Sequence, residues 1–154
     1  MKKLILVIAL GFAAILSAPA QAANDSATVN VTINLTSKCV FGAVAPVAFT
    51  YTSFQGAAST ATGGTFNMKC TNTMPYKIGF TNTATPATTD AVTDDAVNLA
   101  YTLGLSATTG TGSGVDQAYT VTGTMAAAQA GTCLTATCTN TAATNKTRTI
   151  YVVY

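Results

Sequence analysis

The stretch Ala27-Thr28-Val29-Asn30-Val31-Thr32-Ile33-Asn34-Leu35-Thr36, here called the alternating segment, decides how the rest of the chain is interpreted. Every odd-numbered residue in it is apolar, and every even-numbered residue is threonine or asparagine. Because successive side chains of a β-strand point to opposite faces, this alternation predicts a strand with one apolar and one polar face. We expect the strand to complete the sheet of another molecule. The alternative is an ordinary first strand of a complete domain.

The residues before the alternating segment have the pattern of a secretory leader. Two lysines follow Met1, residues 4–16 form an apolar run, and small residues follow at the spacing that a signal peptidase reads. An apolar run of about 13 residues is too short to span a bilayer, which needs roughly 20. We therefore expect residues 1–22 to be a cleaved signal peptide, with cleavage after Ala22 or, as second choice, after Ala20. A permanent amino-terminal anchor is the alternative, and we expect none in the mature protein.

Charge and composition exclude several classes of function. Without residues 1–22, five basic residues stand against five aspartates, so the net charge is near zero and no basic patch suits nucleic acid. The chain contains no His, Glu or Trp, so neither a Ser-His-Asp nor a Cys-His site can form. Asp94 and Asp95 are adjacent in a polar stretch that we expect to be a solvated loop. We expect no enzymatic activity and no cofactor.

The body of the chain is typical of short strands joined by turns. Its 31 threonines favour strands because threonine is β-branched, and clusters of Gly, Asn and Ser separate the apolar runs. We expect residues 56–64, 82–96 and 108–114 to lie outside the core strands. The alternating runs, which we expect to be strands, are 38–44, 47–54, 65–71, 76–81, 99–105, 117–124 and 147–154. Regularly spaced strands in an exported chain indicate an all-β sandwich of two sheets.

Four cysteines in an exported chain of this size predict two disulfides. Three pairings are possible in principle, and sequence distance favours Cys39–Cys70 and Cys133–Cys138. A metal site is a poor alternative because the chain has no His and no paired CxxC spacing.

Several short stretches of the chain carry a family resemblance: Cys39, Phe49 to Tyr51, Gly63-Gly64 leading to Cys70-Thr71, Met74-Pro75-Tyr76-Lys77-Ile78, Leu99-Ala100-Tyr101 and Ile150-Tyr151-Val152-Val153-Tyr154. In their order and spacing they resemble the spore coat protein U domain family, which includes subunits of archaic chaperone–usher pili. The chain departs from the family where a Gly-x-Tyr-x-Asp stretch commonly precedes the final strand. Here residues 131–138 carry the second cysteine pair instead, which either stiffens a loop or shapes a subunit contact or binding face.

The resemblance implies an immunoglobulin-like sandwich, residues 38–154, that lacks its last strand. Residues 23–37 would then be a donor strand that fills the groove of the next subunit. The residues expected to fill that groove are Ala27, Val29, Val31, Ile33 and Leu35. Those of the last strand expected to line the groove or contact a chaperone are Ile150, Val152 and Tyr154.

The function that the resemblance implies is that of a structural pilus subunit that serves adhesion and biofilm formation. Its expected partners are identical or related subunits, a periplasmic chaperone and an outer-membrane usher. The expected location is the periplasm in transit and then the cell surface. The alternative is a monomeric secreted coat or carbohydrate-binding protein that folds onto its own first strand.

Overall fold

The computed structural model of the chain describes residues 24–154, which fall into two parts divided between Asn34 and Leu35. The second part, residues 35–154, is called the body below. The predicted signal peptide, residues 1–22, lies outside the described residues.

The body is all-β, and its one short helical turn among the described residues is the 3-10 helix η1 (Asn140–Ala142). Its eleven strands are β1 (Cys39–Phe41), β2 (Val47–Ala48), β3 (Ser59–Thr60), β4 (Thr62–Gly63), β5 (Thr65–Cys70), β6 (Pro75–Gly79), β7 (Thr89–Thr93), β8 (Ala100–Leu105), β9 (Thr109–Thr111), β10 (Gln117–Met125) and β11 (Tyr151–Val153).

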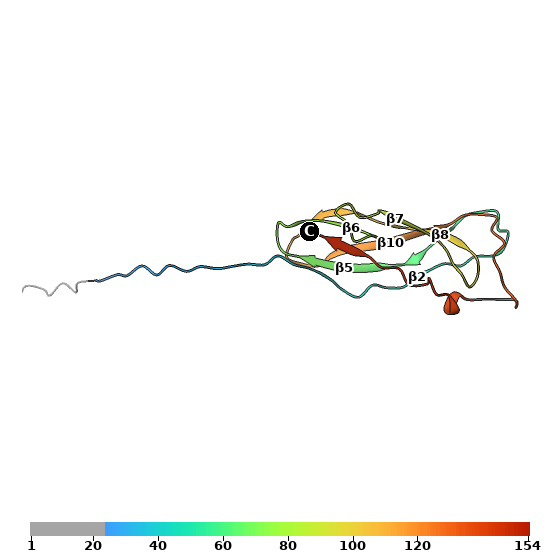
Figure 1. The fold of residues 1–154 in the computed structure, drawn as a ribbon, viewed down its shortest axis with the longest axis horizontal. Coiled ribbons are helices and arrows are strands. Elements are labelled where there is room, and N and C mark those ends of the chain that lie inside the picture. The colour runs from blue at the N-terminus through green and yellow to red at the C-terminus, as the bar shows by residue number, and fades with distance from the viewer. Residues whose placement is uncertain (1–23) are drawn as a thin grey trace, which may run out of the picture. The chain divides into compact units, whose positions relative to one another are not determined.

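The strands form antiparallel sheets in two main groups (Figure 1). The larger sheet has the order β1-β5-β10-β8-β7, with β3 also paired to β10, and the smaller has the order β11-β6-β9. Strands β2 and β4 form a separate pair. The predicted all-β class is confirmed, and the curled antiparallel sheets are those of an immunoglobulin-like sandwich. That a neighbour's strand completes it stays a prediction.

The core lies where inward-facing side chains of both sheets meet. Strand β5 buries every second residue, Phe66, Met68 and Cys70, and leaves the residues between them exposed. Strand β6 contributes Tyr76 and Ile78, and β10 contributes Tyr119 and Val121. The ring centroid of Phe66 lies 5.5 Å from that of Tyr119 and 5.7 Å from that of Phe41. Alternation in the sequence is thus converted into one buried face per strand.

Two core tyrosines satisfy each other's polar ends. The hydroxyl groups of Tyr76 and Tyr119 are hydrogen-bonded, and the Tyr76 hydroxyl also donates to Oε1 of Gln117 at 3.1 Å. Burial, followed by the Tyr119 hydrogen bond, raises the pKa of Tyr76 to about 12. In the β6–β9 ladder Tyr76 is opposite Gly110, and a side chain at position 110 would collide with the Tyr76 ring.

Both cysteine pairs that sequence distance favours are joined in the structure. Cys39 and Cys70 are direct partners in the β1–β5 ladder, and both are buried. Cys133 and Cys138 close a hairpin whose residues are exposed.

Several expected element boundaries are wrong. Only β2 forms within residues 47–54, and only β11 forms within residues 147–154, so both strands are much shorter than predicted. Conversely, β9 lies in the stretch expected to be flexible, residues 108–114, because its backbone pairs with β6. The expected loop 56–64 contains β3 and β4. Strand β7 lies within residues 82–96, as an edge strand of the larger sheet.

Candidate functional site

The body carries an open groove of about 690 Å³. One side is formed by residues 44–49 and Tyr51, which follow β1 in the chain. The other side is formed by residues 146–148 and Ile150, which precede β11. The groove is also lined by side chains of β8 and β10 and of the residues next to β6 and β8: Phe80, Leu99, Tyr101, Leu103, Val121 and Met125. The groove is therefore a mainly apolar trough between two chain segments.

On the first side of the groove, the backbone hydrogen bonds point away from the groove, toward β5 and β4. The N–H groups of Gly42 and Ala45 donate to the carbonyls of Asn67 and Thr65, both at 2.8 Å. The carbonyl of Pro46 accepts from the N–H of Gly64 at 3.0 Å. Gly64 has a φ of 72°, a left-handed conformation that glycine adopts without strain. These bonds hold the segment at the rim of the larger sheet.

The second side of the groove ends in a strand at the edge of its sheet. Strand β11 is terminal in the order β11-β6-β9, and no described strand pairs with its other edge. An edge strand presents N–H and C=O groups that can pair with an added strand. Phe49 and Tyr51 face the same groove without being part of a ladder, and the ring of Phe49 lies 5.7 Å from that of Tyr101. The groove therefore offers both an apolar surface and a strand edge.

One end of the groove is polar and closely tied together. Asp94 is only 2% exposed and accepts from the backbone N–H groups of Ala96 and Val97, both at 3.0 Å. Its other oxygen accepts from Nδ2 of Asn140 at 2.9 Å. The expectation that Asp94 belongs to a solvated loop is therefore wrong, because it links the β7–β8 loop to η1.

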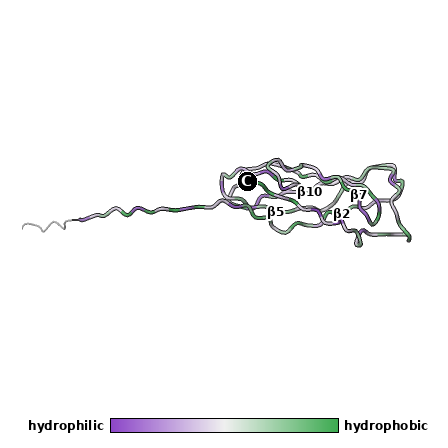
Figure 2. Tube along the Cα trace, in the orientation of Figure 1, coloured by the Kyte–Doolittle hydropathy of each residue, from purple (hydrophilic) through white to green (hydrophobic). Residues whose placement is uncertain are grey.

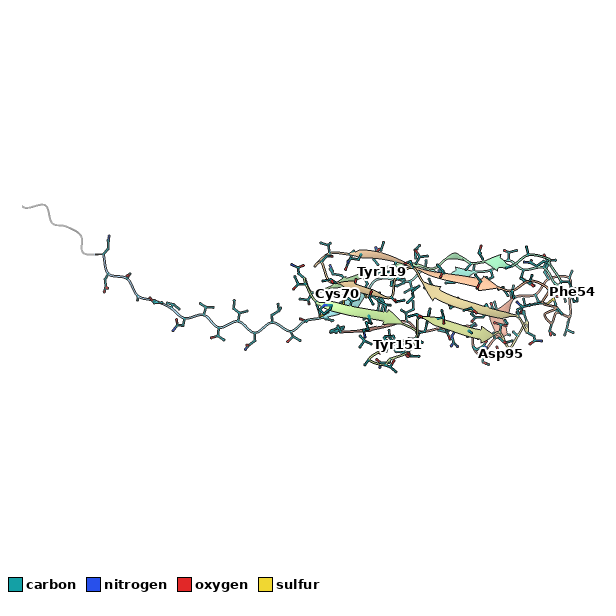
Figure 3. The ribbon with its side chains drawn as sticks, turned by 90° about the horizontal axis from the view of Figure 1, so that it is seen from above. Phe54, Cys70, Asp95, Tyr119 and Tyr151 are labelled. Atoms are coloured by element: carbon teal, nitrogen blue, oxygen red, sulfur yellow. A yellow bond between two sulfur atoms is a disulfide. The ribbon has the colours of Figure 1, made fainter. Side chains whose placement is uncertain are left out.

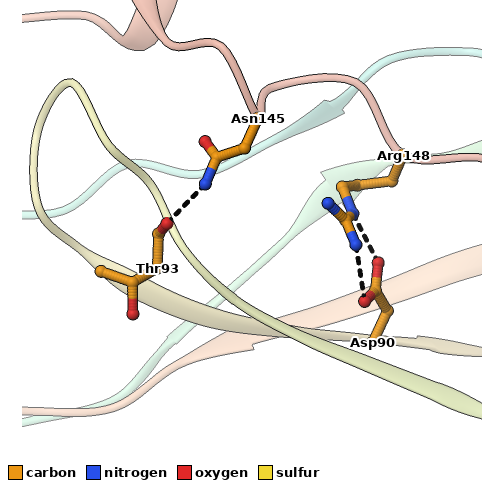
Figure 4. Close-up of polar contacts among 4 residues, drawn as sticks. All are labelled: Asp90, Thr93, Asn145 and Arg148. Atoms are coloured by element: carbon orange, nitrogen blue, oxygen red, sulfur yellow. Dashed lines mark hydrogen bonds and ion pairs between the residues drawn. The ribbon is translucent and has the colours of Figure 1, made fainter.

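Further along, the C-terminal side of the groove is fastened to β7 (Figure 4). Asn145 donates through Nδ2 to the carbonyl of Thr93 at 2.6 Å, and Arg148 forms an ion pair with Asp90 at 2.6 Å. The hydrogen bond to Asp90 raises the pKa of Arg148, so the guanidinium stays charged. Burial raises the pKa of the Tyr101 hydroxyl in the same region.

Among residues 24–154, no strand pairs with the alternating segment. Residues 24–38 are assigned to no strand, and hydropathy alternates along the segment (Figure 2). Its apolar side chains are open to solvent: Val29 is 80% exposed, Val31 76%, Ile33 83% and Leu35 80%. Ala27 is exposed as well. Four large apolar side chains on one face therefore lack cover.

The three residues singled out in the last strand differ in position. Ile150 lines the groove, whereas Val152 packs against the core from its place in β11. Tyr154 is 58% exposed and does not line the groove. Sequence reasoning did not single out the side chains that line the inside of the groove, such as Leu99, Leu103 and Val121. Their alternation marks them as apolar strand residues, but no sequence signal separates a trough from a filled core.

Comparison with known proteins yields one match. A family model described as Spore Coat Protein U domain matches residues 25–153. The chain belongs to the Spore Coat Protein U domain family. The match spans the alternating segment and nearly all of the body. Searches of curated proteins and of solved structures found no match.

The disulfides bear on where this family member folds. Its two disulfides are typical of proteins that fold in an oxidising, exported environment. Within residues 24–154, no helix is both long and apolar enough to cross a membrane.

Proposed function

We propose that this chain is the structural subunit of a surface pilus, assembled by donor-strand exchange through a chaperone–usher pathway. In this proposal the alternating segment of one subunit occupies the groove of the next. The proposal is supported by two features that one chain combines. One is an apolar groove beside a strand edge, and the other is an exposed strand-like segment with one apolar face.

The dimensions of the two partners agree. Residues 44–51 form eight positions along the groove, roughly 26 Å at about 3.3 Å per strand residue. Val29 to Leu35 is seven positions, roughly 23 Å on the same scale. A strand of this length reaches along the groove with its Thr and Asn side chains facing solvent.

The energetics favour the exchange. Burying Val29, Val31, Ile33 and Leu35 contributes roughly 6–12 kcal/mol gross, at about 1.5–3 kcal/mol for each side chain. About eight to ten backbone hydrogen bonds add near 1 kcal/mol each net. Ordering ten residues costs about 1–2 kcal/mol for each backbone unit, so the apolar contacts decide the sign. Strand addition to a sheet edge is an established recognition mode that chaperone–pilin complexes use.

Repetition of this contact makes a fibre. The donor strand and the groove are different surfaces of one chain, and such head-to-tail contacts propagate unless the rotation closes a ring. Before assembly the open groove needs a temporary cover, for which a periplasmic chaperone is the proposed partner, with an outer-membrane usher as the assembly site. Adhesion and biofilm formation are the proposed uses of the fibre at the cell surface.

Deleting residues 23–36 tests the proposal. The mature chain without them is expected to be unstable alone and to be rescued by a synthetic peptide of residues 27–36. The matched control is the same peptide with Ile33→Asp, which is expected to rescue poorly. A truncated chain that remains a stable monomer without chaperone or peptide contradicts strand exchange.

A further inference from the structure

Two large apolar side chains of the body are strongly exposed: Phe54 is 73% exposed and Leu134 is 98% exposed. Exposed apolar side chains that lie together are characteristic of interaction sites. Phe54 lies at the end of the body opposite to Cys70 (Figure 3). We call this end the Phe54 end, and the end with the Cys39–Cys70 disulfide the Cys39 end.

Both side chains are carried by loops that the fold holds in place. The N–H of Phe54 donates to the carbonyl of Gln129 at 2.8 Å, and Oγ of Ser53 donates to the carbonyl of Ala130 at 2.6 Å. A few residues further, the backbone N–H of Thr132 donates to the carbonyl of Val97 at 2.7 Å. The Cys133–Cys138 disulfide then closes the hairpin that carries Leu134. Gln129, which holds Phe54, and Thr132 are only three residues apart, so the hairpin follows directly on the loop that holds Phe54, and its Cys138 lines the groove.

On the basis of the proposed function, the direction of the donor strand decides which part of the neighbouring subunit lies at the Phe54 end. Residues 39–51 run from the Cys39 end to the Phe54 end, and β11 runs in the opposite direction because it is antiparallel to β6. A donor strand parallel to β11 would leave the groove at the acceptor's Cys39 end. Every body would then meet both of its neighbours at its own Cys39 end, and successive bodies would collide.

A donor strand antiparallel to β11 avoids this collision and leaves at the Phe54 end. Antiparallel pairing is also slightly more stable for each residue. From Leu35 to Cys39 the chain advances four residues, at most about 14 Å when extended. The Cys39 end of the incoming subunit must therefore lie close to Phe54 and the hairpin.

The Cys39 end carries an apolar side chain of its own. Val115 is 64% exposed, in a loop whose Gly114 donates to the carbonyl of Cys70 at 3.1 Å. The same loop accepts, at the Gly112 carbonyl, from the N–H of Thr73 at 2.8 Å. Each end of the body thus presents a braced loop with an exposed apolar residue.

We propose that Phe54 and Leu134 form a docking patch for the Cys39 end of the next copy of this chain, with Val115 as the facing side chain. The patch is a second subunit contact besides the donor strand. It fixes the angle between successive bodies, whereas the donor strand holds them together.

Thiol labelling tests the contact directly. Phe54→Cys is placed in the full-length mature chain, and its labelling rate is compared between fibres and a single subunit. The single subunit carries Ile33→Asp, so that it donates no strand, and has its groove filled by a peptide of residues 27–36. Labelling is expected to be at least about tenfold slower in fibres, because interface contacts exclude water. Ala107→Cys, at an exposed site between β8 and β9, is the control and is expected to react equally in both.

Equal labelling of Phe54→Cys in fibres and in the single subunit overturns the docking patch and leaves strand exchange standing. Failure of the wild-type chain to form fibres overturns the proposed function, and the docking patch with it. A second variant avoids the added thiol: Phe54→Asn with Leu134→Ser, where asparagine suits the φ of 63° at position 54. Fibres of this variant are expected to form but to lose stiffness in electron micrographs, and unchanged stiffness contradicts the proposal.

Discussion

Arg148 and Asp90 form a two-point ion pair: Nε of Arg148 donates to Oδ2 of Asp90 at 2.6 Å, and Nη2 donates to Oδ1 at 2.9 Å. The pair connects one side of the groove to edge strand β7, as Figure 4 shows. Two parallel bonds fix direction as well as distance, which a lysine cannot reproduce. The C-terminal side of the groove is thereby held in one place.

Replacing Arg148 with Met is expected to lower the free energy of unfolding of the peptide-filled subunit by about 0.5–1.5 kcal/mol, because Asp90 loses its partner. The estimate is kept small because the Arg148 side chain is 33% exposed. Lys146→Met is the matched control, since Lys146 lines the same groove but bonds only to the carbonyl of Thr141. Denaturant unfolding measures both, and equal losses would contradict a special role for the ion pair.

Asp94 is expected to matter more for stability than its neighbour Asp95. Asp94→Ala leaves two backbone N–H groups and the Asn140 amide without their acceptor in a partly buried site. The expected loss is roughly 2–3 kcal/mol in the free energy of unfolding, since unsatisfied buried donors are costly. Asp95→Ala is the comparison, with a smaller loss expected because Asp95 is exposed. Thermal unfolding of the two variants ranks them, and the opposite order would refute this account of the polar end.

Stability is expected to fall in acid partly through Asp95. The hydrogen bond from the Thr144 hydroxyl, followed by backbone N–H bonds, lowers the pKa of Asp95 below its ordinary 3.8. A lowered carboxyl pKa stabilises the folded state above the unfolded value, and this contribution is lost as the pH falls through the folded pKa. Asp95→Asn should therefore show a shallower loss of stability below about pH 4 in denaturant titrations. An unchanged acid slope would show that Asp95 does not contribute.

The two disulfides are expected to differ in importance. In the chain-entropy model, the Cys39–Cys70 loop contributes roughly 3–4 kcal/mol and the Cys133–Cys138 loop roughly 2 kcal/mol. Replacing Cys39 and Cys70 by Ala also removes buried sulfur from the core, whereas the second pair is exposed. We expect the first double variant to unfold at clearly lower denaturant concentration than the second. The reverse order would mean that the hairpin stabilises more than its own loop.

Alternation predicted the central strands well because burial on one face enforces it. Residues 65–71 and 117–124 were expected as strands, and β5 and β10 occupy nearly those positions. Alternation overstated residues 47–54 and 147–154, because Phe49 and Ile150 face the open groove rather than a paired strand. Apolar residues at every second position show which face of a strand is apolar, but they do not show whether a neighbouring strand is present.

Other misses come from contacts between distant parts of the chain. Strand β9 forms because its backbone pairs with β6, and its Gly110 leaves room for the Tyr76 ring opposite it. Asp94 is buried because Asn140, 46 residues away, donates to it. Neither relationship is visible in local composition. The groove itself depends on two segments about a hundred residues apart: the family resemblance placed Ile150 on it, but no local pattern marks residues 44–51 as its other side.

The most direct measurement of the central claim compares two aspartates on opposite faces of the alternating segment. Ile33→Asp puts a charge on the apolar face, where burial without a partner costs several kcal/mol. Asn34→Asp puts the same charge on the polar face. Cells that make each variant are examined for surface fibres, and their unheated extracts are examined by gel electrophoresis for a ladder of subunit multimers. Detection of the subunit in the periplasm checks that it is exported. The account predicts no fibres and no ladder for Ile33→Asp, and both for Asn34→Asp. Normal fibres from Ile33→Asp would contradict it.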